Sequence, residues 1–230
     1  MSIVYIISAP SGSGKSTLVN EIRRIVPDLD FSVSYTTRPP RGNERNGCEY
    51  FFVSREEFER MAREGEFLEY AEVFGNYYGT ARRFLRKAEQ EGHDLLLDID
   101  VQGAAQIKQA IPQAVSIFVL PPNRETLERR LRTRGSDSEN VIRRRLVTAT
   151  QEIENYRKYD YILVNNLLDQ SVEELRAILL SERLRRGGQM PSKDDPKTLK
   201  IAEGCRLDKV RERVQPILAS FATTVAPGRH

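Results

Sequence analysis

Cysteine is scarce in this sequence, with only Cys48 and Cys205 among 230 residues. They lie far apart, and neither has a second cysteine or a histidine at metal-ligand spacing. A disulfide framework and a structural zinc site are therefore not expected. The sequence predicts two reduced thiols, as is usual in a reducing compartment.

Long hydrophobic runs are also missing. No apolar stretch approaches the roughly 18–20 residues that a membrane-spanning helix needs. The first residues, MSIVYIISAPSG, carry no basic leader of the kind that opens a secretory signal. We therefore expect a cytoplasmic protein with no membrane partner.

A large excess of charge of one sign is absent, because the formal net charge is only +3. Arginine is nevertheless concentrated in the clusters LERRLRTRG (127–135) and IRRRL (142–146). Aromatic side chains do not alternate with these arginines, as they do in proteins that stack the bases of single-stranded nucleic acid. The pattern favours local anion-binding sites over a nucleic-acid partner.

Alternating strands and helices are indicated along most of the chain. Four short apolar runs predict buried parallel strands at 3–7, 95–99, 115–120 and 161–164. Helical patterns follow them at 16–26, 101–111, 124–159 and 171–184, and the last opens with the capping pattern Ser171-x-x-Glu174. This alternation predicts an α/β fold in which helices flank a parallel sheet.

The chain divides by composition into a core with appendages and contains no internal repeat. We expect the core at 1–33, 83–122 and 147–186, an inserted subdomain at 34–82 and an arginine-rich lid at 123–146. The insert contains the strand-like piece 49–53 and a helix opened by Ser54-x-x-Glu57. Glycines and prolines predict a linker at 187–204, followed by a helical extension and tail at 205–230, in which Pro216 should kink or divide the helix.

A phosphate-binding loop is indicated by SAPSGSGKST (8–17), which follows the first predicted strand and opens the first helix. In this context Lys15 would reach the β- and γ-phosphates of ATP, and the Ser16 hydroxyl would ligate Mg²⁺. Ala9 stands where the usual pattern has its first glycine. The alternative is a glycine- and serine-rich loop with a solvated lysine. We expect the ATP-binding residues to be Ala9, Pro10, Ser11, Gly12, Ser13, Gly14, Lys15, Ser16 and Thr17.

Three further motifs, SYTTRPPR (34–41), NYYGT (76–80) and DIDVQG (98–103), join this loop. Together they resemble guanylate kinase, over about residues 3–183, and SAPSG is similar to the form that the loop often takes in bacterial members. The resemblance implies a P-loop NTPase fold and transfer of phosphate from Mg²⁺-ATP to GMP, and to dGMP as well, in purine nucleotide metabolism. Oligomeric state and a role for 187–230 are not indicated.

The resemblance also implies a site for GMP. Its phosphate would be held by Arg38, Arg41, Tyr50 and Tyr78, because guanidinium and phenol donors match the oxygens of a group that carries about −1.5 to −2 charges. Glu69 would accept the guanine N1 and N2 protons, a pair of donors that adenine lacks. The implied GMP-binding set is Ser34, Arg38, Arg41, Tyr50, Glu69, Tyr78, Gly79, Thr80 and Asp100.

Two acids, Asp98 and Asp100, lie at the carboxyl end of the predicted strand 95–99, where ligands bind in open α/β sheets. Asp98 is the better candidate for holding Mg²⁺ through water, and Asp100 for facing GMP. Either could instead be the N-cap of the helix at 101–111.

The lid arginines Arg130, Arg134 and Arg145 are implied on the ATP phosphates and the transferring group. With Lys15 and Arg38 they form the predicted catalytic set. We expect the neighbouring arginines of both clusters to be solvated, namely Arg129, Arg132, Arg143 and Arg144. Asn165 is either a contact of the ATP adenine or a turn residue, and the two interpretations are equally favoured.

Other functional classes are weighed against this interpretation. Guanylate-kinase-like domains in scaffold proteins bind peptides and carry a degraded nucleotide site, whereas the loop lysine, the lid arginines and the base-reading acid are all present here. A kinase of the same architecture could act on another phosphorylated metabolite, such as a ribose bisphosphate. Glu69 and NYYGT favour guanine.

Overall fold

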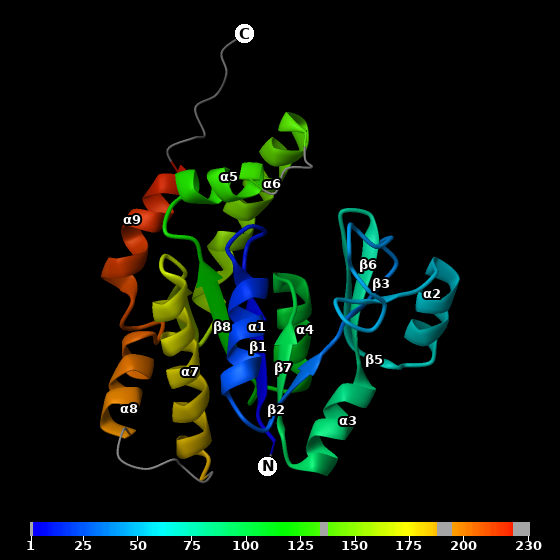
Figure 1. The fold of residues 1–230 in the computed structure, drawn as a ribbon, viewed down its shortest axis with the longest axis horizontal. Helices are drawn as coiled ribbons and strands as arrows, with labels where there is room; N and C mark the ends of the chain where they lie inside the picture. The colour runs from blue at the N-terminus through cyan, green and yellow to red at the C-terminus, as the bar shows by residue number, and fades with distance from the viewer. Residues whose placement is uncertain (1, 134–137, 188–194, 223–230) are drawn as a thin grey trace. The chain divides into compact units, whose positions relative to one another are not determined.

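The computed structural model describes residues 2–133, 138–187 and 195–222. The chain forms two compact units, one containing residues up to Ile7 together with 26–115, and the other containing 8–25 and the chain from 116 onward. We call them unit 1 and unit 2, and Figure 1 shows their helices and strands.

Unit 1 contains three parallel strands in the order β2-β7-β1, which are Leu29–Ser32, Asp94–Asp98 and Val4–Ser8. The three leucines of β7 are fully buried between its two neighbours. Helices α3 (Arg82–Glu91) and α4 (Val101–Ala110) precede and follow β7. The strands predicted from the apolar runs at 3–7 and 95–99 are confirmed within a residue or two.

The predicted insert forms a second sheet in unit 1. Its strands are β3 (Tyr35–Thr36), β4 (Phe51–Phe52), β5 (Phe67–Val73) and β6 (Asn76–Ala81), in the order β4-β3-β6-β5. Helix α2 (Arg55–Arg63) packs on it through a largely aromatic core that includes Phe58 and Phe67. The predicted cap of this helix is confirmed, because the Glu57 N–H donates to Ser54 Oγ at 3.1 Å.

Unit 2 holds the parallel pair β8 (Val115–Leu120) and β9 (Tyr161–Val164). Its helices are α1 (Lys15–Ile25), α5 (Arg124–Thr133), α6 (Glu139–Ile153), the 3₁₀ turn η1 (Glu154–Lys158) and α7 (Leu168–Arg185). The predicted capping role of Ser171 is wrong, because α7 begins three residues earlier, at Leu168. The Ser171 side chain is instead fully buried, with its hydroxyl 3.4 Å from the Val164 carbonyl of β9.

The C-terminal region contains helices α8 (Asp195–Gly204) and α9 (Arg211–Ala222). The linker predicted at 187–204 is therefore wrong for 195–204, while 188–194 lie outside the described residues. Pro196 occupies the second position of α8, where a missing N–H costs the helix nothing. Ala202 is fully buried, and α8 packs along α7 (Figure 1). Helix α9 is not divided at Pro216 and continues through it.

Among the described residues, every helix is too short or too polar to cross a membrane.

Candidate active site

The loop between β1 and α1 has the geometry of a phosphate-binding turn. Strand β1 ends at Ser8, and α1 begins at Lys15. Gly12 and Gly14 have φ of 92° and 87°, a conformation that side chains with a Cβ rarely adopt. The turn is closed by the Ser13 N–H, which donates to the Pro10 carbonyl at 3.1 Å. A strand, a tight turn and a helix N-terminus therefore follow one another as phosphate binding requires.

Both glycines are also needed for packing within unit 2. A Cβ on Gly12 would lie 2.9 Å from Leu131 Cδ2, and one on Gly14 would lie 2.4 Å from Asn165 Nδ2. Helix α5 and the residue after β9 thus touch the loop directly. The loop is fixed by its neighbours as well as by its own turn.

Two side chains hold the Ser13 carbonyl of this loop. Asn165 Nδ2 donates to it at 2.8 Å, and one guanidinium nitrogen of Arg130 donates to it at 3.3 Å. A second Arg130 nitrogen donates to the Asn165 carbonyl at 3.0 Å. Burial, followed by the positive charge of Arg129, lowers the pKa of Arg130. Asn165, which the sequence left open between two roles, lies against the loop.

A cavity of about 450 Å³ borders the loop in unit 2. It falls in the range of small-molecule sites. Its walls come from the loop, from α5, from the turn after β9 and from the starts of α1 and α7, and they consist of Gly12, Gly14, Thr17, Arg129, Arg130, Thr133, Asn165, Asn166 and Leu168.

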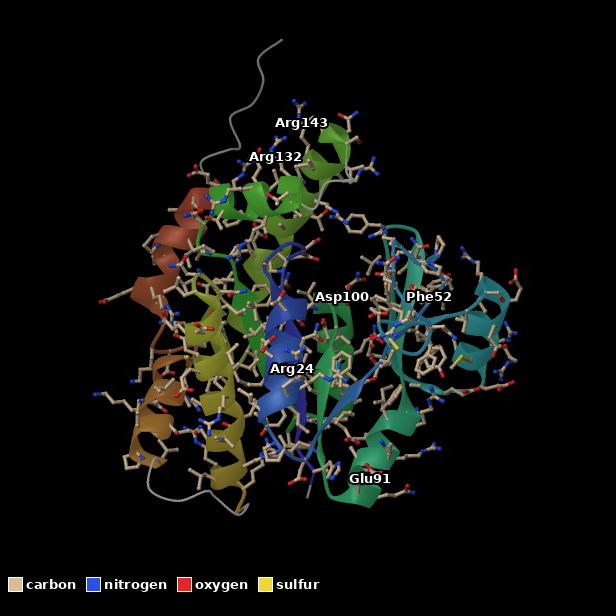
Figure 2. The ribbon with its side chains drawn as sticks, viewed as in Figure 1. Arg24, Phe52, Glu91, Asp100, Arg132 and Arg143 are labelled. Carbon is tan, nitrogen blue, oxygen red and sulfur yellow. The ribbon has the colours of Figure 1, made fainter. Side chains whose placement is uncertain are left out.

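The remaining lid arginines lie on α5 and α6, except Arg134, which is outside the described residues. Arg145 is half-buried on α6, whereas Arg129, Arg143 and Arg144 are exposed. Arg132 donates to Glu128 at 2.8 Å and also pairs with Glu139, so it joins α5 to α6. Figure 2 labels Arg132 and Arg143, two of the four arginines that were predicted to be solvated.

In unit 1, Arg38 is held by a carboxylate that the sequence analysis did not single out. Its side chain is 6% exposed, and one guanidinium nitrogen donates to both Glu44 oxygens at 2.9 Å. The Arg41 backbone N–H donates to the same carboxylate at 2.8 Å, while the Arg41 side chain is exposed. The available signal was an acid in the same turn, within RPPRGNE (38–44).

Two tyrosines complete this cluster. The Arg38 guanidinium lies 5.3 Å from the centre of the Tyr50 ring, and Tyr50 and Tyr78 meet edge to face at 5.9 Å. Burial raises the pKa of Tyr50 to about 12, and the negative charge of Asp98 adds to the effect. The Tyr50 phenol therefore stays protonated at neutral pH and can donate a hydrogen bond. Asp98, at the end of β7, lies near the predicted phosphate-holding residues.

Glu69 is a buried carboxylate on β5, opposite Thr80 on β6. Its side chain is 5% exposed, and burial, with a smaller contribution from the charge of Asp100, raises its pKa to about 7. Thr80 acts in the opposite direction and lowers the pKa. A Cβ on Gly103 would lie 2.4 Å from Glu69 Oε2, so the start of α4 closes tightly over the carboxylate.

Asp100 has the N-cap role that the sequence left open. Its Oδ1 accepts the Gly103 N–H at 2.8 Å and so opens α4 (Figure 2). Its charge also raises the pKa of Glu69, so Asp100 both caps α4 and lies close to the predicted guanine site.

Two further residues of the predicted GMP site, Ser34 and Gly79, have structural roles in unit 1. Ser34 is half-buried, and its carbonyl accepts the Phe51 N–H at 2.9 Å. Gly79 is buried in β6, where a Cβ would lie 3.0 Å from both Phe58 and Phe67. Gly79 therefore lets the aromatic core of the insert close.

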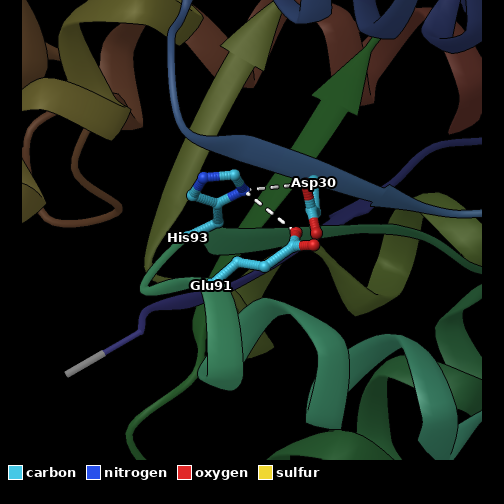
Figure 3. Close-up of side chains that lie close together, drawn as sticks. All are labelled: Asp30, Glu91 and His93. Carbon is cyan, nitrogen blue, oxygen red and sulfur yellow. Dashed lines mark hydrogen bonds and ion pairs between the residues drawn. The ribbon is translucent and has the colours of Figure 1, made fainter.

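A second titratable cluster in unit 1 consists of Asp30, Glu91 and His93 (Figure 3). His93 Nδ1 lies 3.1 Å from Asp30 Oδ1 and 3.5 Å from Glu91 Oε2. The Lys87 ammonium lies 3.6 Å from Glu91 and 3.9 Å from Asp30. A cation within the chain already faces both carboxylates, so we interpret the cluster as an ion-pair network that joins α3 to β2.

Comparisons with known proteins agree with this geometry. A family model described as guanylate kinase matches residues 1–182. The chain is 56% identical over 227 residues to the guanylate kinase of Koribacter versatilis (strain Ellin345), covering 97% of each chain. It is 49% identical over 193 residues to the guanylate kinase of Escherichia coli (strain K12), covering 83% of this chain and 93% of the relative. A solved guanylate kinase structure from Anaplasma phagocytophilum matches with a TM-score of 0.68 at 36% identity, covering 80% of this chain and 87% of that one.

Proposed function

The chain belongs to the guanylate kinase family and is a nucleoside monophosphate kinase, and we propose that residues of unit 1 bind GMP and residues of unit 2 bind ATP. We assign the GMP-binding subdomain to 34–82, the lid to 123–146 and the P-loop core to the flanking segments. The product pair is then ADP and GDP.

The observation that carries this proposal is the buried carboxylate of Glu69. Guanine presents two adjacent N–H donors to such a group, and adenine does not. Because Glu69 is almost fully enclosed, the wrong base would leave it unpaired in a site where an unmade hydrogen bond is costly. Thr80, Ser34 and Asp100 would complete the contacts with the base.

The phosphate of GMP would bind Arg38, Arg41, Tyr50 and Tyr78. Glu44 holds the Arg38 fork and the Arg41 backbone, so these donors are positioned before the nucleotide arrives. The protonated Tyr50 phenol supplies a neutral donor. The attacking phosphate oxygen is already largely ionised, and no general base is required.

On the ATP side, loop amides and Lys15 would bind the β- and γ-phosphates, and Arg130, Arg134 and Arg145 would act on the transferring group. The described contacts place Arg130 on the loop backbone, which supports a role in shaping the site.

We propose Mg²⁺ as the cofactor. The Ser16 hydroxyl in the first turn of α1 and the Asp98 carboxylate, through water, are the hard oxygen donors that this ion prefers. When bound, the ion would neutralise charge on the phosphates.

A coupled assay of ADP release tests the proposal. Mg²⁺-ATP is supplied with GMP, dGMP, AMP, UMP and a ribose bisphosphate in turn, beside a Glu69→Ala variant. We expect turnover with GMP, and with dGMP, that is mostly lost in the variant. A folded protein with no turnover on any acceptor would instead support a peptide-binding scaffold domain.

We also propose a cytoplasmic location. Cys48 is exposed and Cys205 is buried, and both are free thiols. An exposed free thiol fits a reducing compartment. Nucleic acid and membranes are not proposed as partners.

A further inference from the structure

The C-terminal region of the chain is tied to the edge of β9 in unit 2. The Ile162 N–H donates to the Cys205 carbonyl at 2.8 Å, and the Leu207 N–H donates to the Asp160 carbonyl at 3.1 Å. Cys205 is buried between these two bonds, and burial raises the pKa of its thiol to about 12. The segment between α8 and α9 therefore behaves as part of the folded core.

Ion pairs strengthen this attachment at two places along α7. Arg185 bridges Glu182 on α7 and Glu203 on α8, at 3.3 Å and 3.2 Å. Farther along, Arg213 on α9 lies 3.0 Å from the buried carboxylate of Glu174. Breaking this second pair would leave a buried charge without its cationic partner, so the pair favours the observed packing of α9 on α7.

Helix α9 is packed against α5 and α6 by an apolar face. Val214, Ile217 and Phe221 lie at helical spacing, and each is buried. In Figure 1, α9 reaches the beginning of α5.

The contact between α9 and α5 includes a helix cap. The N–H of Arg124, the first residue of α5, donates to the Ser220 hydroxyl of α9 at 3.1 Å. Ser220 lies 96 residues away in sequence, and its hydroxyl donates in turn to the Ile217 carbonyl at 2.6 Å. The first N–H groups of a helix have no partner within the helix, so α9 supplies one that α5 needs. Asn123 supplies another, because its Oδ1 accepts the Thr126 N–H.

The same α5 helix touches the phosphate loop one and two turns farther along. A Cβ on Gly12 would lie 3.0 Å from Leu127 Cδ1 and 2.9 Å from Leu131 Cδ2, and Arg130 donates to the Ser13 carbonyl. A rigid helix transmits a displacement of its first turn to the residues that follow. The ten residues of α5 therefore connect the Ser220 cap to the contacts with the phosphate loop.

We propose that α9 positions the ATP site, with Ser220 as the positioning residue at the start of α5. The proposal rests on the assignment of ATP to unit 2. It gives the C-terminal region a function that the sequence alone did not indicate. Ser220 touches no substrate and acts only through α5.

The test compares Ser220→Ala, Ser220→Thr and Gln215→Ala in the full chain. Gln215 is an exposed residue of the same helix and serves as the control. If the whole free energy of one helix cap were lost from ATP binding, KM for ATP would rise about fivefold, which sets the upper limit of the effect. We expect Ser220→Ala to raise KM for ATP and to leave KM for GMP unchanged. Ser220→Thr, which keeps a hydroxyl, and Gln215→Ala should both have the KM for ATP of the wild type.

A titration with ADP alone separates this inference from the assigned reaction. Weaker ADP binding by Ser220→Ala supports the positioning role even if GMP were not the acceptor. Equal ADP affinity of Ser220→Ala and the wild type would overturn it, as would equal increases in KM for ATP and GMP. Failure of the wild type to phosphorylate GMP would count against the proposed function alone.

Discussion

The proposed acceptor site in unit 1 is lined by charged and phenolic side chains, whereas the phosphate loop in unit 2 is formed largely by main chain. In unit 1, Arg38 is held by Glu44, and Glu69 is enclosed by Gly103. In unit 2, two glycines with positive φ shape the loop, and its Ser13 carbonyl is held from outside. Side chains can discriminate one base from another. Backbone amides bind a phosphate in whatever nucleotide carries it.

The largest effect is expected where the loop depends on a side chain. Lys15→Ala should lower kcat on the order of 10³-fold, because a positive charge on the transferring phosphates is lost. Steady-state kinetics with saturating ATP and GMP measure this loss. Arg24→Ala, an exposed position on the same helix, is the matched control and should retain activity. Full activity of Lys15→Ala would exclude the Lys15 side chain from catalysis.

A loss of about 10²-fold or more in kcat/KM for GMP is expected for Glu69→Gln, with KM for ATP unchanged. In the wild type, kcat/KM for GMP should also depend on the protonation of Glu69, and therefore on pH. Only the carboxylate accepts both guanine protons, and its pKa is about 7. kcat/KM for GMP should therefore rise as the pH increases through 7, and the variant should lack this rise. A parallel profile in both proteins would contradict the assignment.

Ionisation of the buried Glu69 carboxylate should lower the free energy of unfolding at high pH. Its folded pKa lies above the usual 4.5, so its stabilising contribution is full below pH 4.5 and is lost as pH rises through 7. The rise of the pKa from 4.5 to about 7 corresponds to a loss of at most about 3 kcal/mol in the free energy of unfolding. Glu69→Gln should thus unfold at higher denaturant concentration than the wild type at pH 8, and at nearly the same concentration at pH 4.5. The comparison is made without nucleotide.

Gly14→Ala tests whether ATP binding depends on the backbone conformation of the phosphate loop. The substitution combines a positive φ with a Cβ that would meet Asn165, so we expect a rise of about tenfold in KM for ATP and a loss of about 1–3 kcal/mol in the free energy of unfolding. Gly187→Ala is the control, because Gly187 has φ of 77° and open space around it. It should lose stability without a change in KM. Similar KM values for ATP in the two variants would contradict a role of the loop conformation at Gly14 in ATP binding.

The smallest effect is expected for Glu44→Gln, which weakens the support of Arg38 and keeps its shape. We expect a rise of about three- to tenfold in KM for GMP, the range of a lost charge-assisted hydrogen bond. Glu49→Gln is the control, because among the described residues the Glu49 carboxylate accepts a hydrogen bond from the Arg45 backbone N–H and none from Arg38. An unchanged KM for GMP in Glu44→Gln would show that the remaining contacts of Arg38, which include the Pro39 carbonyl and the Tyr50 ring, are enough to position it.

Features with a local physical cause could be predicted from the sequence. Apolar runs predicted β1, β7, β8 and β9, and Ser54-x-x-Glu57 predicted the cap of α2. Strand β2 was missed because its Leu29–Ser32 segment carries Asp30 and Ser32 and is ordered by pairing with β7. Helix α8 was missed because its proline was interpreted as a break in the chain, although it stands at the helix start.

The sequence by itself determined the turn of the phosphate loop, since only glycine adopts its φ values without strain. It also determined which chemical groups were available to each site. Tertiary structure alone decided which of them meet. Asn165 reaches Ser13 across 152 residues, and Ser220 reaches Arg124 across 96. These contacts depend on how whole helices and strands pack, and no periodicity or spacing along the chain encodes which distant side chain fills a given place.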